Sequence, residues 1–216
     1  TENDGNINSV NGSEVDAKIE TLKEHIKNIE EKYEHQFGVW EGLLKVDAKP
    51  VVYLDLELGG KPCGRIRIML TCGPKRREEM LRLCLGQGGN TWKGAPFAWA
   101  SEIGQPGENL QIWAYMTSSG EKDSEFLGQH ELEGNTCFKL VEGTVTGSSS
   151  SGHGFNICTR TEPSKTYMGN VLGRVVSGLD LLREAISLLE ANENHTCYDA
   201  DHFIISEAGV EAMKII

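Results

Sequence analysis

Apolar side chains near the start of the chain recur in alternating steps of four and three residues. Such steps place side chains along one face of a helix and are typical of the seam of a coiled coil. Ser13 precedes the pattern as an N-cap and Gly38 follows it as a stop. We therefore expect a helix over 14–37, which either pairs with a second chain or packs on its own domain, and the strict alternation favours self-association. The seam consists of Val15, Ile19, Leu22, Ile26, Ile29 and Tyr33.

After residue 50 the apolar pattern changes from a helical period to a strand period. Residues 51–58 begin apolar and end alternating, and residues 65–70 alternate throughout. Two such runs joined by a turn are typical of an antiparallel hairpin. The Gly59-Gly60 pair lies between the two runs and supplies the turn. We therefore expect a β-hairpin at the start of this region.

Two helices and several further strands complete the predicted pattern. Pro74 stands at the favoured first position of a helix that ends at Gly86, and a second amphipathic helix covers 179–189. From Gly86 to residue 134 short apolar runs alternate with glycines, which predicts short strands and loops. Later apolar runs predict strands at 154–159, 170–176 and 202–206.

These patterns divide the chain into four parts. Residues 1–13 are rich in Asn, Gly and Ser, and we expect them to be disordered. The coiled-coil helix of 14–37 follows, and 38–50 is a connector. Residues 51–216 are long enough to form one domain with its own hydrophobic core.

Composition and charge restrict the partners that the protein can have. The chain of 216 residues has 32 acidic and 21 basic side chains, and this acidic balance argues against binding to the phosphates of a nucleic acid. No run of eighteen apolar residues is present, so we expect no membrane-spanning helix. The 6 cysteines include no CxxC pair, so we expect no metal site and no cofactor. As reduced thiols they indicate a cytoplasmic or nuclear protein.

The order of the predicted elements resembles that of the cyclophilins. The resemblance implies a mainly β fold, with an eight-stranded closed antiparallel barrel, two capping helices and the coiled-coil helix as an N-terminal addition. It extends over roughly 51–210, and its segments follow one another in the family's order and spacing. The matching segments are 52–55, 64–66, 74–86, 155–159, 171–175 and 205–209.

The resemblance also locates the positions at which cyclophilins catalyse prolyl cis/trans isomerisation. There, a Phe-His pair is followed by an Arg that stabilises the twisted amide. In this chain Phe97 is followed by Ala98 and Trp99. An indole carries no charge, so it cannot supply the same electrostatic stabilisation. The chain has no Arg between Arg82 and Arg160, so this conclusion does not depend on an exact alignment.

The other positions of the family's groove have changed as well. In the segment 109–115, Leu110 stands for a Met and Ile112 for a Gln, although Gln111 lies next to it. Asn156 replaces a Phe of the family's proline pocket. The Trp, Leu and His of the family's following loop correspond to Ser164, Lys165 and Gly169 in this chain. The candidate residues of this degenerate, partner-binding groove are Ala98, Trp99, Asn109, Leu110, Ile112, Trp113, Asn156, Ser164, Lys165 and Gly169.

We therefore predict a catalytically inactive, cyclophilin-like module that binds a protein partner or peptide segment and forms a homodimer through its N-terminal helix. Trp92, Trp99 and Trp113 cluster in sequence around the predicted groove. They either belong to the core, where aromatic clusters are usually found, or anchor a partner, because Trp is favoured in interface hot spots. Such a scaffold or adaptor resembles tripartite-motif ubiquitin ligases that end in a cyclophilin domain, although this sequence has no RING or B-box cysteine pattern. The alternative is an active or weakly active peptidyl-prolyl isomerase with an atypical site.

Overall fold

A computed structural model of the chain describes residues 20, 21, 23, 24, 49–124, 136–147, 154–198 and 200–211. The chain divides into two compact units, Thr1–Leu43 and Leu44–Ile216. The four described residues of the first unit have helical backbone and are exposed. The six seam positions, the leader of 1–13 and most of the connector lie outside the described residues, so self-association through this segment stays a prediction.

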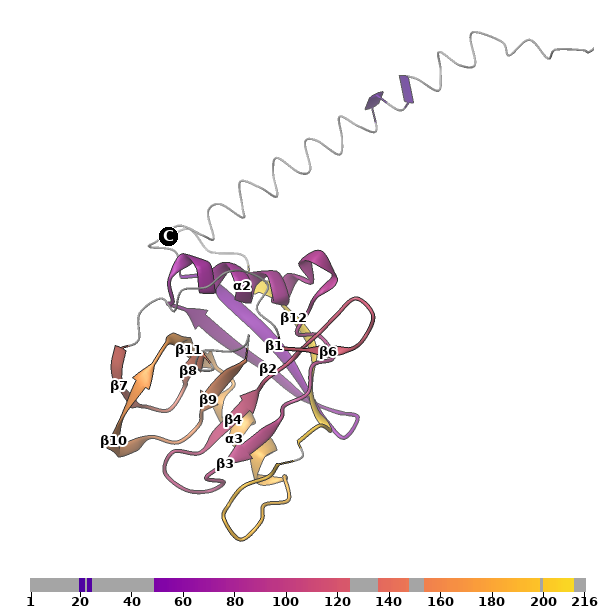
Figure 1. The fold of residues 1–216 in the computed structure, drawn as a ribbon. Coiled ribbons are helices and arrows are strands. Elements are labelled where there is room, and N and C mark those ends of the chain that lie inside the picture. Colours follow the sequence, from indigo (N-terminus) through magenta and orange to yellow (C-terminus); the bar gives the residue numbers. More distant parts are fainter. Residues whose placement is uncertain are drawn as a thin grey trace, which may run out of the picture. The chain divides into compact units, whose positions relative to one another are not determined.

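The second unit is built on an eight-stranded antiparallel sheet (Figure 1). Its strands are β1 (Val51–Leu58), β2 (Lys61–Leu70), β3 (Trp99–Ser101), β4 (Asn109–Ile112), β8 (Thr144–Gly147), β9 (Phe155–Cys158), β11 (Val171–Ser177) and β12 (Phe203–Glu211). They lie side by side in the order β12-β1-β2-β11-β8-β9-β4-β3. The predicted hairpin of β1 and β2 is therefore confirmed, as are the strands predicted near β9, β11 and β12.

Two small sheets and the helices complete the unit. Their bounds are β5 (Tyr115–Met116) with β6 (Lys122–Asp123), β7 (Thr136–Leu140) with β10 (Glu162–Gly169), α2 (Pro74–Leu85), α3 (Leu179–Ser187) and the 3-10 helix η1 (Gln87–Gly89). The two predicted helices are thus present. As predicted, Pro74 is the first residue of α2 and Gly86 ends it with a left-handed φ of 66°.

The eight-stranded sheet curls into a half-barrel and does not form the closed barrel that we predicted. Its two edge strands are β12 and β3. Among the described residues, isolated bridges between Pro96 and Ile204 and between Ala100 and Cys197 join this region, in place of a continuous ladder. Proline has no N–H to donate to a ladder, and β3 has 3 residues. The strand pairing therefore stops short of closure.

The hydrophobic core lies on the inner face of the curled sheet. Strand register aligns Ala100, Leu110, Ile157 and Val145 in one row across β3, β4, β9 and β8, and all four are fully buried. Gly173 of β11 continues this row by pairing with Val145, and a Cβ at that position would lie 2.2 Å from the carbonyl oxygen of Met69. The inner row fixes by alternation which side chains must face outward on the same strands.

None of the helices in the described part of the chain is long and apolar enough to cross a membrane.

Candidate functional site

A row of outward-facing residues crosses the sheet opposite the inner row. Strand register pairs Trp99 with Gln111, Gln111 with Asn156, Asn156 with Thr146, and Thr146 with Val171. We call these five residues the outer row. Along the chain, each of them directly precedes or follows a buried residue, as the period of two in a strand requires. The outer row contains no charged side chain.

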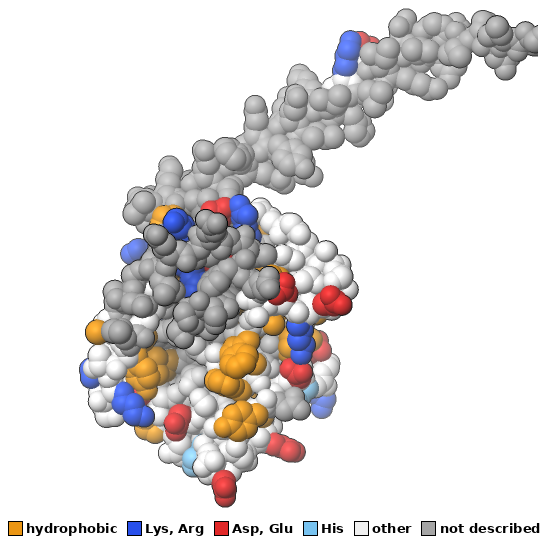
Figure 2. Space-filling model, viewed as in Figure 1, with side chains coloured by type: hydrophobic (Ala, Val, Ile, Leu, Met, Phe, Trp, Pro, Cys, Tyr) orange, Lys and Arg blue, Asp and Glu red, His pale blue; other side chains and the backbone are white. Residues whose placement is uncertain are grey.

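One end of the outer row carries three aromatic side chains, Trp99, Trp113 and Tyr198, which we call the aromatic cluster. The rings of Trp99 and Trp113 have centroids 4.8 Å apart and an interplanar angle of 62°. The ring of Tyr198 lies 6.4 Å from that of Trp99 at an angle of 90°. Trp113 is 47% exposed and Tyr198 is 69% exposed. Figure 2 shows hydrophobic side chains gathered on this face, over β3 and β4.

The backbone explains why residues so distant in sequence meet in the aromatic cluster. The backbone N–H of Ala100 donates to the carbonyl of Cys197 at 3.0 Å, and the N–H of Cys197 donates back to Ala100 at 2.9 Å. This reciprocal pair places Tyr198 beside Trp99. Trp113 directly follows the last residue of β4, where the ladder to β9 has ended. Its side chain is therefore free of the sheet and packs on the neighbouring indole.

Two amide side chains of the outer row have no hydrogen-bond partner among the described residues: Gln111 and Asn156. Gln111 is 8% exposed, and Asn156 is half-buried. The amide atoms of both side chains are accessible to solvent. A bound ligand can replace water at these amides, because each amide both donates and accepts. The amide of Asn109 differs, since it donates to Ser101 Oγ at 2.8 Å and to the carbonyl of Gly107 at 3.1 Å.

The structure brings some of the predicted groove residues together and separates others. Ala98, Trp99, Trp113 and Asn156 lie on or next to the outer row, and Asn109 lies at the start of β4. Leu110 and Ile112 are fully buried on the inner face.

The remaining predicted residues, Ser164, Lys165 and Gly169, lie on β10, in the small sheet with β7. Ser164 and Lys165 are exposed there, and Gly169 pairs with Thr136 of β7. None of the three is paired with a strand of the eight-stranded sheet. They therefore do not belong to the outer row.

Sequence reasoning missed Thr146 and Tyr198, and it noted Gln111 beside Ile112 without counting it among the groove residues. The alternation of β4 contains the signal for Gln111, because Leu110 and Ile112 share one face and Gln111 must take the other. Thr146 follows from register once β8 is paired with β9. Tyr198 follows an irregular loop, and no periodic pattern marks its position.

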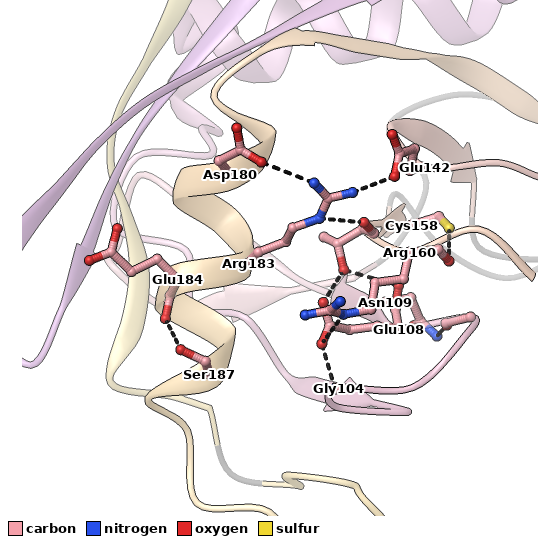
Figure 3. A network of polar contacts seen from close by, with 12 residues as sticks. Gly104, Glu108, Asn109, Glu142, Cys158, Arg160, Asp180, Arg183, Glu184 and Ser187 are labelled. Carbon is pink, nitrogen blue, oxygen red and sulfur yellow. Dashed lines mark hydrogen bonds and ion pairs between the residues drawn. The ribbon is translucent and has the colours of Figure 1, made fainter.

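A buried carboxylate holds the loop between β3 and β4 (Figure 3). The side chain of Glu108 is 2% exposed and accepts hydrogen bonds of 2.6 Å from Thr159 Oγ1 and of 2.6 Å from the N–H of Gly104. It also forms an ion pair with Arg160 at 3.3 Å. Because Glu108 directly precedes β4, these contacts fix the start of the strand that carries Gln111.

An arginine of α3 extends the same polar network (Figure 3). The Nε of Arg183 donates to the carbonyl of Thr159 at 2.8 Å, and its Nη1 donates to Asp180 at 3.0 Å. Its Nη2 forms an ion pair with Glu142, which precedes β8. The network therefore joins α3, the end of β9 and the loop before β4 into one support for the outer row.

A hollow of about 430 Å³ lies between the β1–β2 hairpin and α3. It is lined mainly by apolar side chains, among them Leu58, Leu181 and Leu188. Cys63 also lines it, and burial raises the pKa of this thiol. A protonated thiol is a weak nucleophile. Cys63 therefore gives this hollow little nucleophilic reactivity.

A comparison of the chain with models of known protein families finds no match. Within the described residues, no group of three or more His, Cys, Asp or Glu side chains is arranged to hold a metal ion.

Proposed function

We propose that the domain of residues 51–216 is a cyclophilin-like binding module that holds a segment of a partner protein on its outer row and does not catalyse prolyl isomerisation. The outer row itself carries the proposal. It combines two amides without hydrogen-bond partners with a cluster of exposed aromatic rings, and it has no charged side chain.

These features suit an extended peptide. A peptide backbone offers one N–H and one C=O for each residue, and the amides of Gln111 and Asn156 can accept from the first and donate to the second. Exposed Trp and Tyr side chains supply large apolar area with few rotatable bonds, which is why they dominate interface hot spots. The row and the cluster are continuous through Trp99, so one segment can contact both.

The absence of a charged side chain from the outer row argues against catalysis. Rotation about a prolyl bond has a barrier of roughly 18–20 kcal/mol, and a cationic donor lowers it by stabilising the twisted amide. The family resemblance would place that donor at Trp99. The chain has no Arg from residue 83 to residue 159, so β3, β4, β8 and β9 have none to offer. An isomerase that uses neutral donors is the rival function.

The helical seam of 14–37 suits a scaffold or adaptor role, because pairing of two chains would present two binding surfaces at once. Light scattering of the full chain should therefore give the mass of a dimer. The variant Leu22→Glu places a charge in the seam and should give a monomer. A monomer for the unchanged chain would refute the self-association.

The binding proposal is tested with the full chain as bait and matched surface variants. A partner captured from a cell extract is identified, purified and titrated against each variant. Trp113→Ala and Gln111→Ala should each weaken binding at least about tenfold, the effect of removing a hot-spot residue. Leu188→Ala is the control, because Leu188 is an apolar side chain, 68% exposed, that belongs neither to the outer row nor to the aromatic cluster and lines the hollow between the β1–β2 hairpin and α3. Equal binding by all variants would refute the proposal.

A further inference from the structure

We propose that the aromatic cluster receives an arginine side chain of the partner segment, with the guanidinium against the indole faces and its charge balanced by the acidic loops beside them. The inference rests on the proposed function and deepens it, because it names the chemistry that the partner must bring. Three observations carry it: exposed aromatic side chains, exposed carboxylates without an ion pair on adjoining loops, and two amide side chains of the outer row without a hydrogen-bond partner among the described residues.

The rings of the aromatic cluster present open faces. Trp113 and Tyr198 stand edge to face with Trp99, at angles of 62° and 90°, and such a contact covers only one face of one ring in each pair. Trp113 and Tyr198 are 47% and 69% exposed, so part of their ring surface is open to a ligand. Among the described residues, no Lys or Arg of the chain lies over these rings. A cation placed over an indole face is attracted by the negative face of the ring, and Trp is the strongest partner for this interaction.

The loops beside the cluster supply negative charge. A hydrogen bond of 2.9 Å from the N–H of Ile103 to the carbonyl of His195 places the 101–108 loop against the 190–198 loop. These two loops contain four Glu residues and no Lys or Arg. Glu108 is buried and paired with Arg160, as described above. The other three, Glu102, Glu190 and Glu193, are exposed, and none has an ion pair with another described residue.

The net charge of the chain acts in the same direction. A net charge of −11 attracts a basic partner segment and repels an acidic one. The local excess of carboxylates then directs a positive group toward the aromatic end of the outer row rather than the end at Val171.

The same domain already binds one of its own arginines in this manner. The guanidinium of Arg65 lies 3.8 Å from the ring centroid of Tyr53, and its Nε and Nη2 each donate to the carboxylate of Asp55 at 2.7 Å. A planar guanidinium can stack on a ring and hydrogen-bond in its own plane at once, which the ammonium of lysine cannot. At the outer row the carbonyl oxygens of Gln111 and Asn156 are the acceptors for these in-plane donors.

The test uses the full chain labelled with ¹⁵N on its indole nitrogens and a pair of blocked tripeptides, Gly-Arg-Gly and Gly-citrulline-Gly. Citrulline has nearly the shape of arginine and no charge. The arginine peptide should shift the indole signals of Trp99 and Trp113 and leave that of the fully buried Trp92 in place. It should bind about tenfold more tightly than the citrulline peptide, as expected for a desolvated cation–π contact.

Variants separate the two sources of the affinity. Trp113→Ala should abolish the preference for arginine, whereas Trp113→Phe, which keeps an aromatic face, should retain part of it. The double variant Glu102→Gln with Glu193→Gln should weaken arginine binding several-fold at low salt, and the difference should vanish in 0.5 M salt because exposed charges are screened.

Equal affinity for the arginine and citrulline peptides would overturn the inference, and so would tighter binding of the corresponding lysine peptide. If these results occur while Trp113→Ala still releases the captured partner, the proposed function stands and the inference alone fails. If Trp113→Ala also leaves the partner bound, both fail.

Discussion

Replacing Glu108 by alanine removes the centre of the polar network that holds the β3–β4 loop. The lost contacts are the hydrogen bonds of 2.6 Å from Thr159 Oγ1 and from the N–H of Gly104, and the ion pair with Arg160. A hydrogen bond to a charged group contributes about 1.5–3 kcal/mol. The ion pair adds about 0.5 kcal/mol, because the Arg160 side chain is 45% exposed. Water entering the vacated site recovers part of the loss, so we expect the free energy of unfolding to fall by about 3 kcal/mol.

Urea unfolding followed by tryptophan fluorescence measures this loss. In a thermal scan the same change lowers the midpoint by about 6–12 °C, at about 2–4 °C for each kcal/mol in a domain of this size. Glu102→Ala is the matched control, since Glu102 lies in the same loop, is exposed and has no ion pair among the described residues. It should change stability by less than about 0.5 kcal/mol. A loss below about 1 kcal/mol for Glu108→Ala, or equal losses for both variants, would refute the role of the network.

Three further predictions follow from the packing of the domain. Trp92→Ala removes a fully buried side chain and should cost about 3–5 kcal/mol in urea unfolding, and a loss below about 1 kcal/mol would place Trp92 at the surface. Gly173→Ala forces a Cβ to 2.2 Å from the carbonyl of Met69 and should cost about 1–3 kcal/mol, whereas unchanged stability would contradict the β2–β11 register. Burial raises the pKa of Cys158 to about 11, so its thiolate fraction falls about tenfold for each pH unit below that value. Between pH 7 and 9 iodoacetamide should therefore modify exposed Cys137 well before Cys158, as mass spectrometry of the native protein will show, and equal rates would contradict the burial.

Local patterns sufficed to predict the elements whose signals are local. The β1–β2 hairpin was predictable because one face of each strand is buried and the other is not, so the side chains alternate. The bounds of α2 were predictable because Pro74 and Gly86 act on the backbone at those positions. β12 extends to Glu211, beyond the predicted end at residue 206, because its pairing with β1 continues through polar residues and a glycine.

The open edge of the sheet depends on contacts that no local pattern contains. The closed barrel was implied by the resemblance of the element order to that of the cyclophilins. Closure would require a continuous ladder between the segment around Pro96 and β12, and the structure has isolated bridges there. Whether a short, irregular segment completes a ladder is decided by tertiary geometry rather than by periodicity.

The candidate site was predictable in part for the same reason. Trp99, Trp113 and Asn156 were identified from the sequence because each falls at a groove position of the resembled family. Leu110 and Ile112 were included with them, but a shift of one residue along a strand exchanges its two faces, and the register assigns the outer face to Gln111. Tyr198 belongs to the aromatic cluster because backbone hydrogen bonds join two segments that lie about a hundred residues apart in the chain. Sequence spacing does not reveal such a contact.

The cis/trans exchange rate of a proline-containing peptide, measured by NMR exchange spectroscopy with a substoichiometric amount of the full chain, tests the central claim most directly. Uncatalysed exchange takes tens to hundreds of seconds at 25 °C, too slow to give exchange peaks on the timescale of the experiment. Without a cationic donor on the outer row, the chain should leave the peptide spectrum free of such peaks. Exchange peaks that grow in proportion to the amount of chain would show a working isomerase and contradict the assignment of the outer row as a surface for binding alone.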